Sequence, residues 1–348
     1  MNNEKQTASR SSRLGGLRKR LSLGSATGAV IGLVGVIIYL AIAEPLFLTW
    51  ENLFNIFRAQ SVIFILAVGM AFVILTGGLD LSIASNTAFA AMTLGMLLKA
   101  GWHWVPAGLV VMAVGSALGL INGLLIGKGK ISWFVATLGT MSVYASIVLV
   151  ATGGTTISLF TVPSFGAIST LANEDIGPIP IMLIVIVALY LLTWVVLHRT
   201  RFGRAIYAVG SNPEAARLNG LNVAWITVGA FVIAGLMAGL AGVVQAGRLS
   251  AAVPTVDPNQ MLAVAAAVLI GGMNLKGGEG GVLGTFLGAL LLGVIQNGLT
   301  LMGISAFWQG TVTGTILIAA VGLAVARDSG AMNKLGRRLR RHTKADVR

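Results

Sequence analysis

The sequence lacks cysteine and is poor in charged residues and histidine. Of its 348 residues, 10% are charged and three are histidines, whereas 56% are hydrophobic. Without cysteine, the chain can form neither a disulfide framework nor a cysteine-ligated metal site. The histidines are far apart in the sequence, and His103 lies between Trp102 and Trp104, a pattern typical of a membrane interface. We recognise no nucleophile–base set and no cluster of metal ligands, so we predict no catalytic site, no metal site and no cofactor bound by this chain.

The apolar composition predicts an all-α polytopic membrane protein, because a soluble domain of this length would contain far more charged residues. The 46 glycines fit this prediction, since small residues allow membrane helices to pack closely. Apolar runs separated by short polar segments predict about ten transmembrane helices. The expected spans cover residues 26–43, 60–76, 83–99, 104–126, 131–151, 178–197, 222–245, 259–273, 282–302 and 306–326.

The net charge of +13 is concentrated near the two ends of the chain. Six basic residues lie in the first 20 positions, and eight lie from Arg327 onward. We therefore divide the chain into a basic cytoplasmic tail at 1–25, a transmembrane domain at 26–326 and a second basic cytoplasmic tail at 327–348. With both termini inside, 21 of the 24 lysines and arginines are cytoplasmic, and residues 152–177 form an outer loop. This distribution indicates contact with membrane lipid rather than with nucleic acid.

The most polar internal segment, residues 198–223, carries four arginines and one acidic residue. Its centre predicts a short helix, because Asn212 is a favourable N-cap, Pro213 suits the first helical position and Glu214 suits the positive end of the helix dipole. Gly220 would end this helix. A helix of about two turns is marginal in water, so we expect it to lie on another surface. The alternative is an ordinary cytoplasmic loop whose charges only fix the topology.

Two glycine-containing turns resemble each other in sequence, TGGLDLS at 76–82 and IGGMNLK at 270–276. They share paired glycines followed by a carboxylate or amide residue: Gly77, Gly78 and Asp80 in the first, and Gly271, Gly272 and Asn274 in the second. The similarity predicts a partial internal repeat, which is common in transporters. Asp80 and Asn274 are both N-cap residue types, so one interpretation is that each caps the next span. The other is that these turns interrupt helices at membrane depth and shape the transport pathway or a gate.

Polar side chains within or beside the expected spans supply further candidates for a transport pathway. As a group they are uncharged, which suits an uncharged, hydroxyl-rich solute better than an ion. Buried side chains of these types also hold membrane helices together, and this alternative stays open for each of them. The candidates are Ser82, Ser85, Asn86, Asn122, Thr137, Thr140, Gln296, Asn297 and Gln309.

The chain contains no phosphate-binding loop of the form GxxxxGK[ST]. The segment GKGK at 127–130 has neither the preceding glycine nor the following hydroxyl residue. If ATP drives this protein, the nucleotide must therefore bind to another chain. Lys128 and Lys130 are better explained as anchors on the cytoplasmic side of the membrane.

The segment Glu214-Ala215-Ala216, followed by Gly220, resembles the EAA loop of bacterial ABC importer permeases. The surrounding RFGRAIYAVGSNPEAARLNG resembles the ribose-type sugar permeases in particular, and this resemblance covers about residues 45–325. It implies the membrane subunit of an importer for a monosaccharide or related polyol in the bacterial inner membrane. It also implies a helix that couples the permease to an ATPase subunit, formed here by Asn212, Pro213, Glu214, Ala215, Ala216, Arg217 and Gly220.

By the same resemblance, the partners are an ABC ATPase subunit that binds the ATP, a periplasmic or lipid-anchored sugar-binding protein, and a second permease chain. Gln260 and Leu262 stand where ribose-type members often carry Glu and Asp, which leaves the identity of the sugar open. The alternative function is a secondary transporter of a small neutral solute, driven by an ion gradient. Such a transporter needs ionisable residues within the membrane. Asp80 and Glu279 are the candidates, and both lie near the ends of expected spans.

Overall fold

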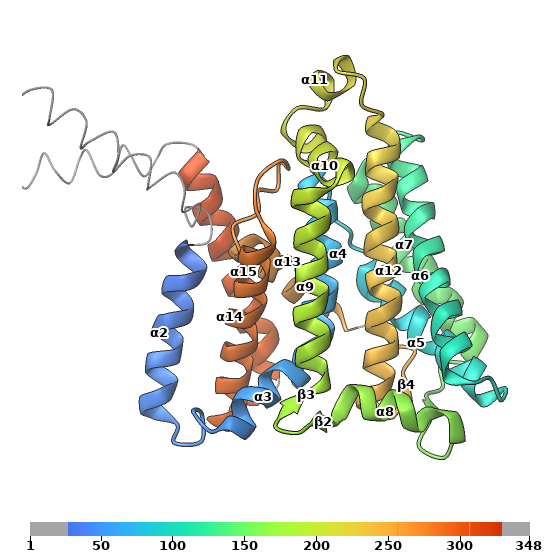
Figure 1. Cartoon of the computed structure of the whole chain (residues 1–348), viewed down its shortest axis with the longest axis vertical. Helices are drawn as coiled ribbons and strands as arrows, with labels where there is room; N and C mark the ends of the chain where they lie inside the picture. The colour runs from blue at the N-terminus through green and yellow to red at the C-terminus, as the bar shows by residue number, and fades with distance from the viewer. Residues whose placement is uncertain (1–26, 256, 306, 329–348) are drawn as a thin grey trace, which may run out of the picture.

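Figure 1 shows the computed structural model, which describes residues 27–255, 257–305 and 307–328. The described chain is a bundle of helices with two small two-stranded sheets, so the prediction of a mainly helical protein is confirmed. The predicted basic tail at 1–25 lies outside the described residues, as do residues 329–348 of the second tail.

The helices follow the apolar runs of the sequence, and a described helix overlaps each of the ten expected spans. They are α2 (Thr27–Ala43), α3 (Trp50–Ala59), α4 (Ser61–Leu75), α5 (Ile83–Lys99), α6 (Trp104–Gly127), α7 (Trp133–Thr152), α8 (Gly166–Asn173), α9 (Ile181–Arg199), α10 (Arg201–Ser211), α11 (Pro213–Leu218), α12 (Val223–Leu249), α13 (Pro258–Ile270), α14 (Val282–Leu301) and α15 (Phe307–Asp328). The short strands are β1 (Ile157–Ser158), β2 (Asp175–Ile176), β3 (Ile179–Pro180) and β4 (Ala251–Ala252).

Helix α12 is 27 residues long and packs against α4, α5 and α6. Glycines bring its backbone into direct contact with that of α6. A Cβ atom built on Gly115 would lie 2.4 Å from the carbonyl oxygen of Gly235, and one built on Gly119 would lie 2.2 Å from the carbonyl oxygen of Phe231. A side chain at either position would push the two helices apart, so the high glycine content permits this close packing.

Five described helices are long and apolar enough to cross a membrane, namely α6, α7, α9, α12 and α14. The number becomes six if α3 and α4, which are bent by 49°, count as one span. The prediction of about ten spans is therefore not confirmed by helix length and composition. Helices α4 and α13 contain 15 and 13 residues, which is about 22 Å and 20 Å against a hydrocarbon core of about 30 Å. Almost all of α4 and the centre of α13 are buried, and buried helices can continue as irregular backbone at membrane depth.

The segment predicted as an outer loop, 152–177, is folded onto the end of α12. Strand β1 pairs antiparallel with β4, which follows α12 directly. The side-chain amide of Asn173, at the end of α8, donates a hydrogen bond of 3.0 Å to the carbonyl oxygen of Gly247. In Figure 1, α3, α8 and strands β2, β3 and β4 lie at the end of the molecule opposite α11. The two ends of the bundle are therefore structurally distinct.

Candidate functional site

The polar segment 198–223 forms two short helices, α10 and α11, at one end of the bundle (Figure 1). Helix α10 is not among the helices expected from the sequence. Its apolar residues Phe202, Ile206 and Val209 follow the i, i+4, i+7 spacing of an amphipathic helix, so the signal was present. The hydroxyl of Thr200 caps α10 by accepting a hydrogen bond of 3.1 Å from the backbone N–H of Gly203. The apolar face of α10 packs into the main hydrophobic core.

Helix α11 has the N-terminal cap predicted from the sequence. The side-chain oxygen of Asn212 accepts a hydrogen bond of 3.0 Å from the backbone N–H of Ala215, and Pro213 occupies the first turn. Glu214 and Arg217 form an exposed ion pair of 2.7 Å on one side of the helix. Leu218, at the last position, is 86% exposed. The helix therefore presents a charged pair and an apolar side chain beyond the end of the bundle.

Gly220 ends α11 with a left-handed backbone, at φ +81°. The backbone N–H of Leu221 donates to the carbonyl oxygen of Ala216 at 3.1 Å, and that of Gly220 donates to the carbonyl oxygen of Arg217 at 3.0 Å. These two bonds form a Schellman motif, whose left-handed residue is usually glycine. The predicted stop at Gly220 is thus confirmed as local structure. The helix has six residues, slightly less than the two turns expected.

The two similar turns of the sequence meet each other beneath α10. A Cβ atom built on Gly277 would lie 2.7 Å from the backbone nitrogen of Gly77, and the backbone N–H of Gly278 donates to the carbonyl oxygen of Leu75 at 3.0 Å. Gly210 of α10 fits between them, since a Cβ atom there would lie 1.9 Å from the Leu75 oxygen and 2.4 Å from the Gly278 nitrogen. The hydroxyl of Tyr207 adds a hydrogen bond of 3.0 Å to the Gly280 carbonyl. We call this contact the glycine junction; sequence analysis did not identify it.

The candidate residues of the two turns adopt related local structures. Gly77 and Gly272 both have left-handed backbones, at φ +83° and +89°, whereas the sequence alignment paired Gly77 with Gly271. Gly78 follows Gly77 and packs against Val73 and Phe231 of the core. The structural correspondence is therefore offset by one residue from the alignment at this point. A repeat of the whole architecture stays a prediction.

Asp80 and Asn274 do not cap the following helices, so that interpretation was wrong. The residues at the N-cap positions of α5 and α14 are Ser82 and Gly281. Instead, one carboxylate oxygen of Asp80 accepts a hydrogen bond of 2.9 Å from the backbone N–H of Ser82, and the amide oxygen of Asn274 accepts one of 3.0 Å from Lys276. Both are turns in which the side chain bonds the backbone two residues later. The bonds stabilise the turns rather than the helix ends.

Asp80, Ser82 and Asn122 form a buried hydrogen-bonded chain between α5 and α6. Asp80 is 1% exposed, and its carboxylate also accepts a bond of 2.6 Å from the Ser82 hydroxyl. The Asn122 amide donates to the same hydroxyl at 2.7 Å. The Tyr144 hydroxyl from α7 lies 3.5 Å from the Asn122 amide oxygen. Ser85 is also buried, and its hydroxyl has no hydrogen-bond partner among the described residues. These contacts favour the interpretation that this group holds helices together.

Asn297 is likewise engaged in a helix contact. Its side chain and that of Asn52 in α3 exchange two hydrogen bonds of 3.0 and 2.8 Å. This reciprocal pair joins α3 to α14 at the end opposite α11. Among the predicted pathway residues of the described chain, Asn297 therefore belongs with the structural contacts.

Gln309 lines a cavity of about 550 Å³. The cavity is bounded by residues from the end of α3, the start of α4, the end of α12 and the segment after it, the start of α13, the second half of α14 and the start of α15. Gln296, another predicted candidate, also lines it. Side chains that the sequence analysis did not select complete the polar wall: Gln60, Gln245, Arg248, Thr255, Asp257, Asn259, Gln260 and Thr313. We call this space the amide cavity.

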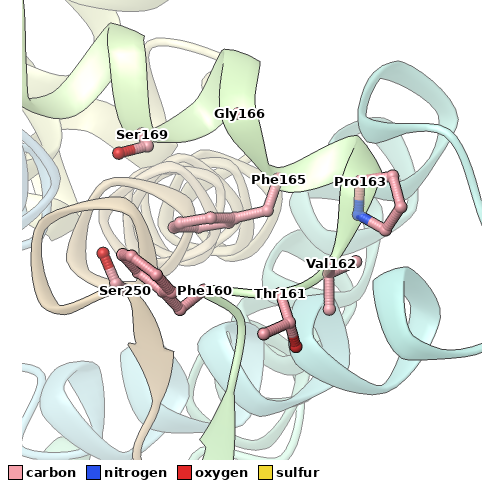
Figure 2. A pocket seen from close by; sticks show the side chains of 8 residues that line it. All are labelled: Phe160, Thr161, Val162, Pro163, Phe165, Gly166, Ser169 and Ser250. Atoms are coloured by element: carbon pink, nitrogen blue, oxygen red, sulfur yellow. The ribbon is translucent and has the colours of Figure 1, made fainter.

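A second cavity, of about 370 Å³, lies in the folded segment at the end opposite α11. Figure 2 shows its wall, in which the rings of Phe160 and Phe165 turn toward Ser250. Phe160 is 82% exposed. The cavity has no charged side chain in its wall, and its residues come mainly from the segment between α7 and α8. It is thus a surface hollow of the end cap, separate from the amide cavity.

Comparison with known proteins identifies the family. Residues 52–321 match the family described as "Branched-chain amino acid transport system / permease component". The chain is 38% identical over 297 residues to the ribose import permease protein RbsC of Escherichia coli (strain K12), covering 84% of this chain and 91% of that protein. It is 37% identical over 294 residues to RbsC of Bacillus subtilis (strain 168), with coverage of 84% and 91%.

It is also 36% identical over 290 residues to the D-allose transport system permease protein AlsC of Escherichia coli (strain K12), with coverage of 83% and 87%. No solved structure matches the chain significantly. These matches confirm the resemblance to the ribose-type permeases, and they favour a transport component over a catalytic subunit. The chain belongs to the family of transport-system permease components that includes the ribose and allose import permeases.

Proposed function

We propose that this chain is the membrane permease of an ATP-driven importer that moves a monosaccharide or related polyol across the bacterial inner membrane. The relatives at 36–38% identity are named for ribose and allose, whereas the family description names branched-chain amino acids. The polar wall of the amide cavity consists mainly of glutamine and asparagine side chains, which supports the sugar assignment. ATP would bind to a partner subunit, since this sequence has no phosphate-binding loop.

The observation that carries the proposal is the structure of α11. It is a six-residue helix, capped at both ends, that projects beyond the bundle with Leu218 almost fully exposed. A helix this short has little stability of its own. An exposed leucine beside an exposed ion pair suits a groove on a protein partner. We assign residues 212–220 as the surface that docks on an ABC ATPase subunit.

The charges support an orientation with α11 in the cytoplasm. Arginines 199, 201, 204 and 217 lie in the segment around α10 and α11, whereas Glu51, Glu174 and Asp175 lie at the opposite end. Lysine and arginine are enriched in cytoplasmic loops. With this orientation we infer that both termini are inside and that ten helices cross, with the short α4 and α13 reaching the surface through their buried turns. The outer end would then receive solute from a sugar-binding protein, and a second permease chain would complete the pathway.

The proposal is tested by purifying the tagged chain under mild detergent and identifying its partners. We expect an ABC ATPase and a sugar-binding protein to co-purify. Reconstituted with them in proteoliposomes, the complex should take up D-ribose, D-allose or D-galactose only when ATP is hydrolysed. L-Leucine serves as the competing substrate class. Uptake of L-leucine but of none of these sugars, or uptake by the chain alone driven by an ion gradient, would refute the proposal.

A further inference from the structure

We propose that the amide cavity is a binding chamber for a neutral, polyhydroxylated solute within this chain. The inference rests on the proposed function and adds a location and a set of residues to it. The cavity, at about 550 Å³, falls within the 300–1,000 Å³ typical of small-molecule sites.

The first reason is the convergence of carboxamide side chains. Six of them line this one space although they come from five different parts of the fold: Gln60, Gln245, Asn259, Gln260, Gln296 and Gln309. A carboxamide offers two N–H donors and a carbonyl acceptor. A sugar hydroxyl likewise both donates and accepts, so a wall of carboxamides can pair with several hydroxyl groups at once. Two threonine hydroxyls, from Thr255 and Thr313, add to this capacity.

The second reason is that hydrogen bonds between the carboxamides position them and still leave donors and acceptors for a solute. The Gln60 amide donates to the Gln296 amide oxygen at 2.8 Å, and the Gln260 amide donates to the Gln245 amide oxygen at 3.4 Å. Each bond occupies one donor and one acceptor of a pair. The donors and acceptors that these bonds do not occupy can face the cavity. The first pair links α3–α4 to α14, and the second links α13 to α12.

The third reason is the charge of the wall. Arg248 and Asp257 are the charged residues that line the cavity, one of each sign. The carboxylate of Asp257 also accepts a hydrogen bond of 2.9 Å from the backbone N–H of Asn259, at the start of α13. The wall therefore has no net charge, and most of its polar atoms are neutral. The apolar side chain of a branched-chain amino acid would leave the carboxamides that it faces without partners.

The position of the cavity fits entry from the outer end. Its residues lie at the start of α4, the end of α12 and the starts of α13 and α15. These helix ends point away from α11, toward the end that carries α8 and the small sheets. Helix α15 lies close against the chamber, since a Cβ atom on Gly310 would lie 2.9 Å from the amide oxygen of Asn259.

The test uses the absence of cysteine from the chain. We would make Gln245→Cys and, as an independent second position in the same wall, Gln309→Cys. The control is Ser169→Cys, which lines the separate cavity of Figure 2. Each variant is assembled with its ATPase and binding protein in proteoliposomes, and we measure the rate at which a membrane-impermeant methanethiosulfonate reagent modifies the thiol. The added probes are D-ribose, D-allose, D-galactose and L-leucine at high millimolar concentration.

We expect the sugar that the complex imports to slow modification of the cysteine at position 245 or 309 at least threefold. L-Leucine should not slow it, and no probe should slow modification at position 169. ATP-dependent uptake, measured on vesicles that carry the unsubstituted chain, tests the proposed function independently of the chamber. Uptake of a sugar with no protection at either wall position would overturn the chamber and leave the proposed function intact. Equal protection at position 169, or protection by L-leucine instead of sugar, would also overturn it. If no sugar is imported, the proposed function fails and the chamber fails with it.

Discussion

Gly220→Val would distinguish a coupling role of α11 from a purely topological one. Gly220 has a φ of +81°, and no heavy atom lies within 4 Å of a Cβ atom built there. The substitution therefore causes no steric overlap, and its cost is conformational. For a residue with a Cβ atom, the left-handed backbone costs about 1–2 kcal/mol, and more for a β-branched side chain. A difference of 1.4 kcal/mol changes a population ratio by a factor of ten. The ratio of capped to uncapped α11 should therefore fall roughly tenfold or more.

Little else in α11 can compensate for that cost. Ala216 is its buried residue, and the Glu214–Arg217 ion pair is exposed. Exposed pairs of this kind contribute about 0.2–1 kcal/mol at most. Loss of the Schellman motif would also change the direction in which the chain enters α12 at Val223. We therefore expect α11 to lose its docking geometry while the membrane helices stay folded.

Gly101→Val is a closely matched control. Gly101 has a φ of +87° with no heavy atom within 4 Å of its Cβ position, and it lies between α5 and α6. Its N–H donates to the carbonyl oxygen of Leu98 at 3.0 Å, and that of Trp102 donates to Leu97 at 3.1 Å, which is the same motif. The two substitutions thus impose similar backbone strain at different places. Only the one in the docking surface should affect coupling.

The assay is reconstitution of each variant with its partners at matched protein level. We expect Gly220→Val to lower sugar uptake and substrate-stimulated ATPase activity together by about tenfold, with near-normal membrane insertion. Gly101→Val should retain both activities. Normal uptake by Gly220→Val would refute the coupling role of this segment. Equal loss in both variants would attribute the effect to general destabilisation.

Three further predictions follow from the turns and the topology. Asp80→Asn should retain more uptake than Asp80→Leu, because leucine leaves the buried N–H of Ser82 without an acceptor at a cost of roughly 1–3 kcal/mol; equal loss would show that the charge itself is required. Gly210→Ala should abolish uptake because its Cβ atom would lie 1.9 Å from a carbonyl oxygen, whereas Gly139→Ala, in open space on α7, should not; uptake by both at matched abundance would count against the glycine junction. Ser164→Cys should react with an impermeant thiol reagent only from the outside, and labelling only from the cytoplasm would reverse the topology.

The sequence was most informative where the structure depends on residues that are adjacent in the chain. The N-cap at Asn212 and the stop at Gly220 are local features, and both are present in the fold. Helix α10 has an equally local signal, but the polar residues around it obscured the spacing of its apolar face. The N-cap interpretation of Asp80 failed for a related reason. An Asp side chain can bond the backbone at a helix end or within a turn, and only the path of the chain decides which.

Long-range features could not be predicted in the same way. Gly77 and Gly277 are 200 positions apart, and nothing in either turn indicates that they touch. The neutral polar residues posed the same difficulty. Asn122 and Gln309 have similar chemistry and lie in similarly apolar surroundings, yet the first is bonded between helices and the second lines a cavity. Hydropathy identifies a membrane span but not the helices that pack against it. Those helices decide which polar side chains can contact a solute.

The two short helices α4 and α13 connect the parts of this molecule that the proposed function requires. At one end their turns, through Leu75 and Gly278, hold Gly210 of α10, which leads directly into α11. At the other end their first residues, among them Val62 and Gln260, line the amide cavity. Almost all of α4 and the centre of α13 are buried, and close-packed interiors transmit displacement rather than absorb it. A movement of α11 imposed by a docked ATPase would therefore reach the cavity wall through two rigid elements. For this reason we expect substitutions in the glycine junction to change access to the cavity even though they lie at the opposite end of α4 and α13.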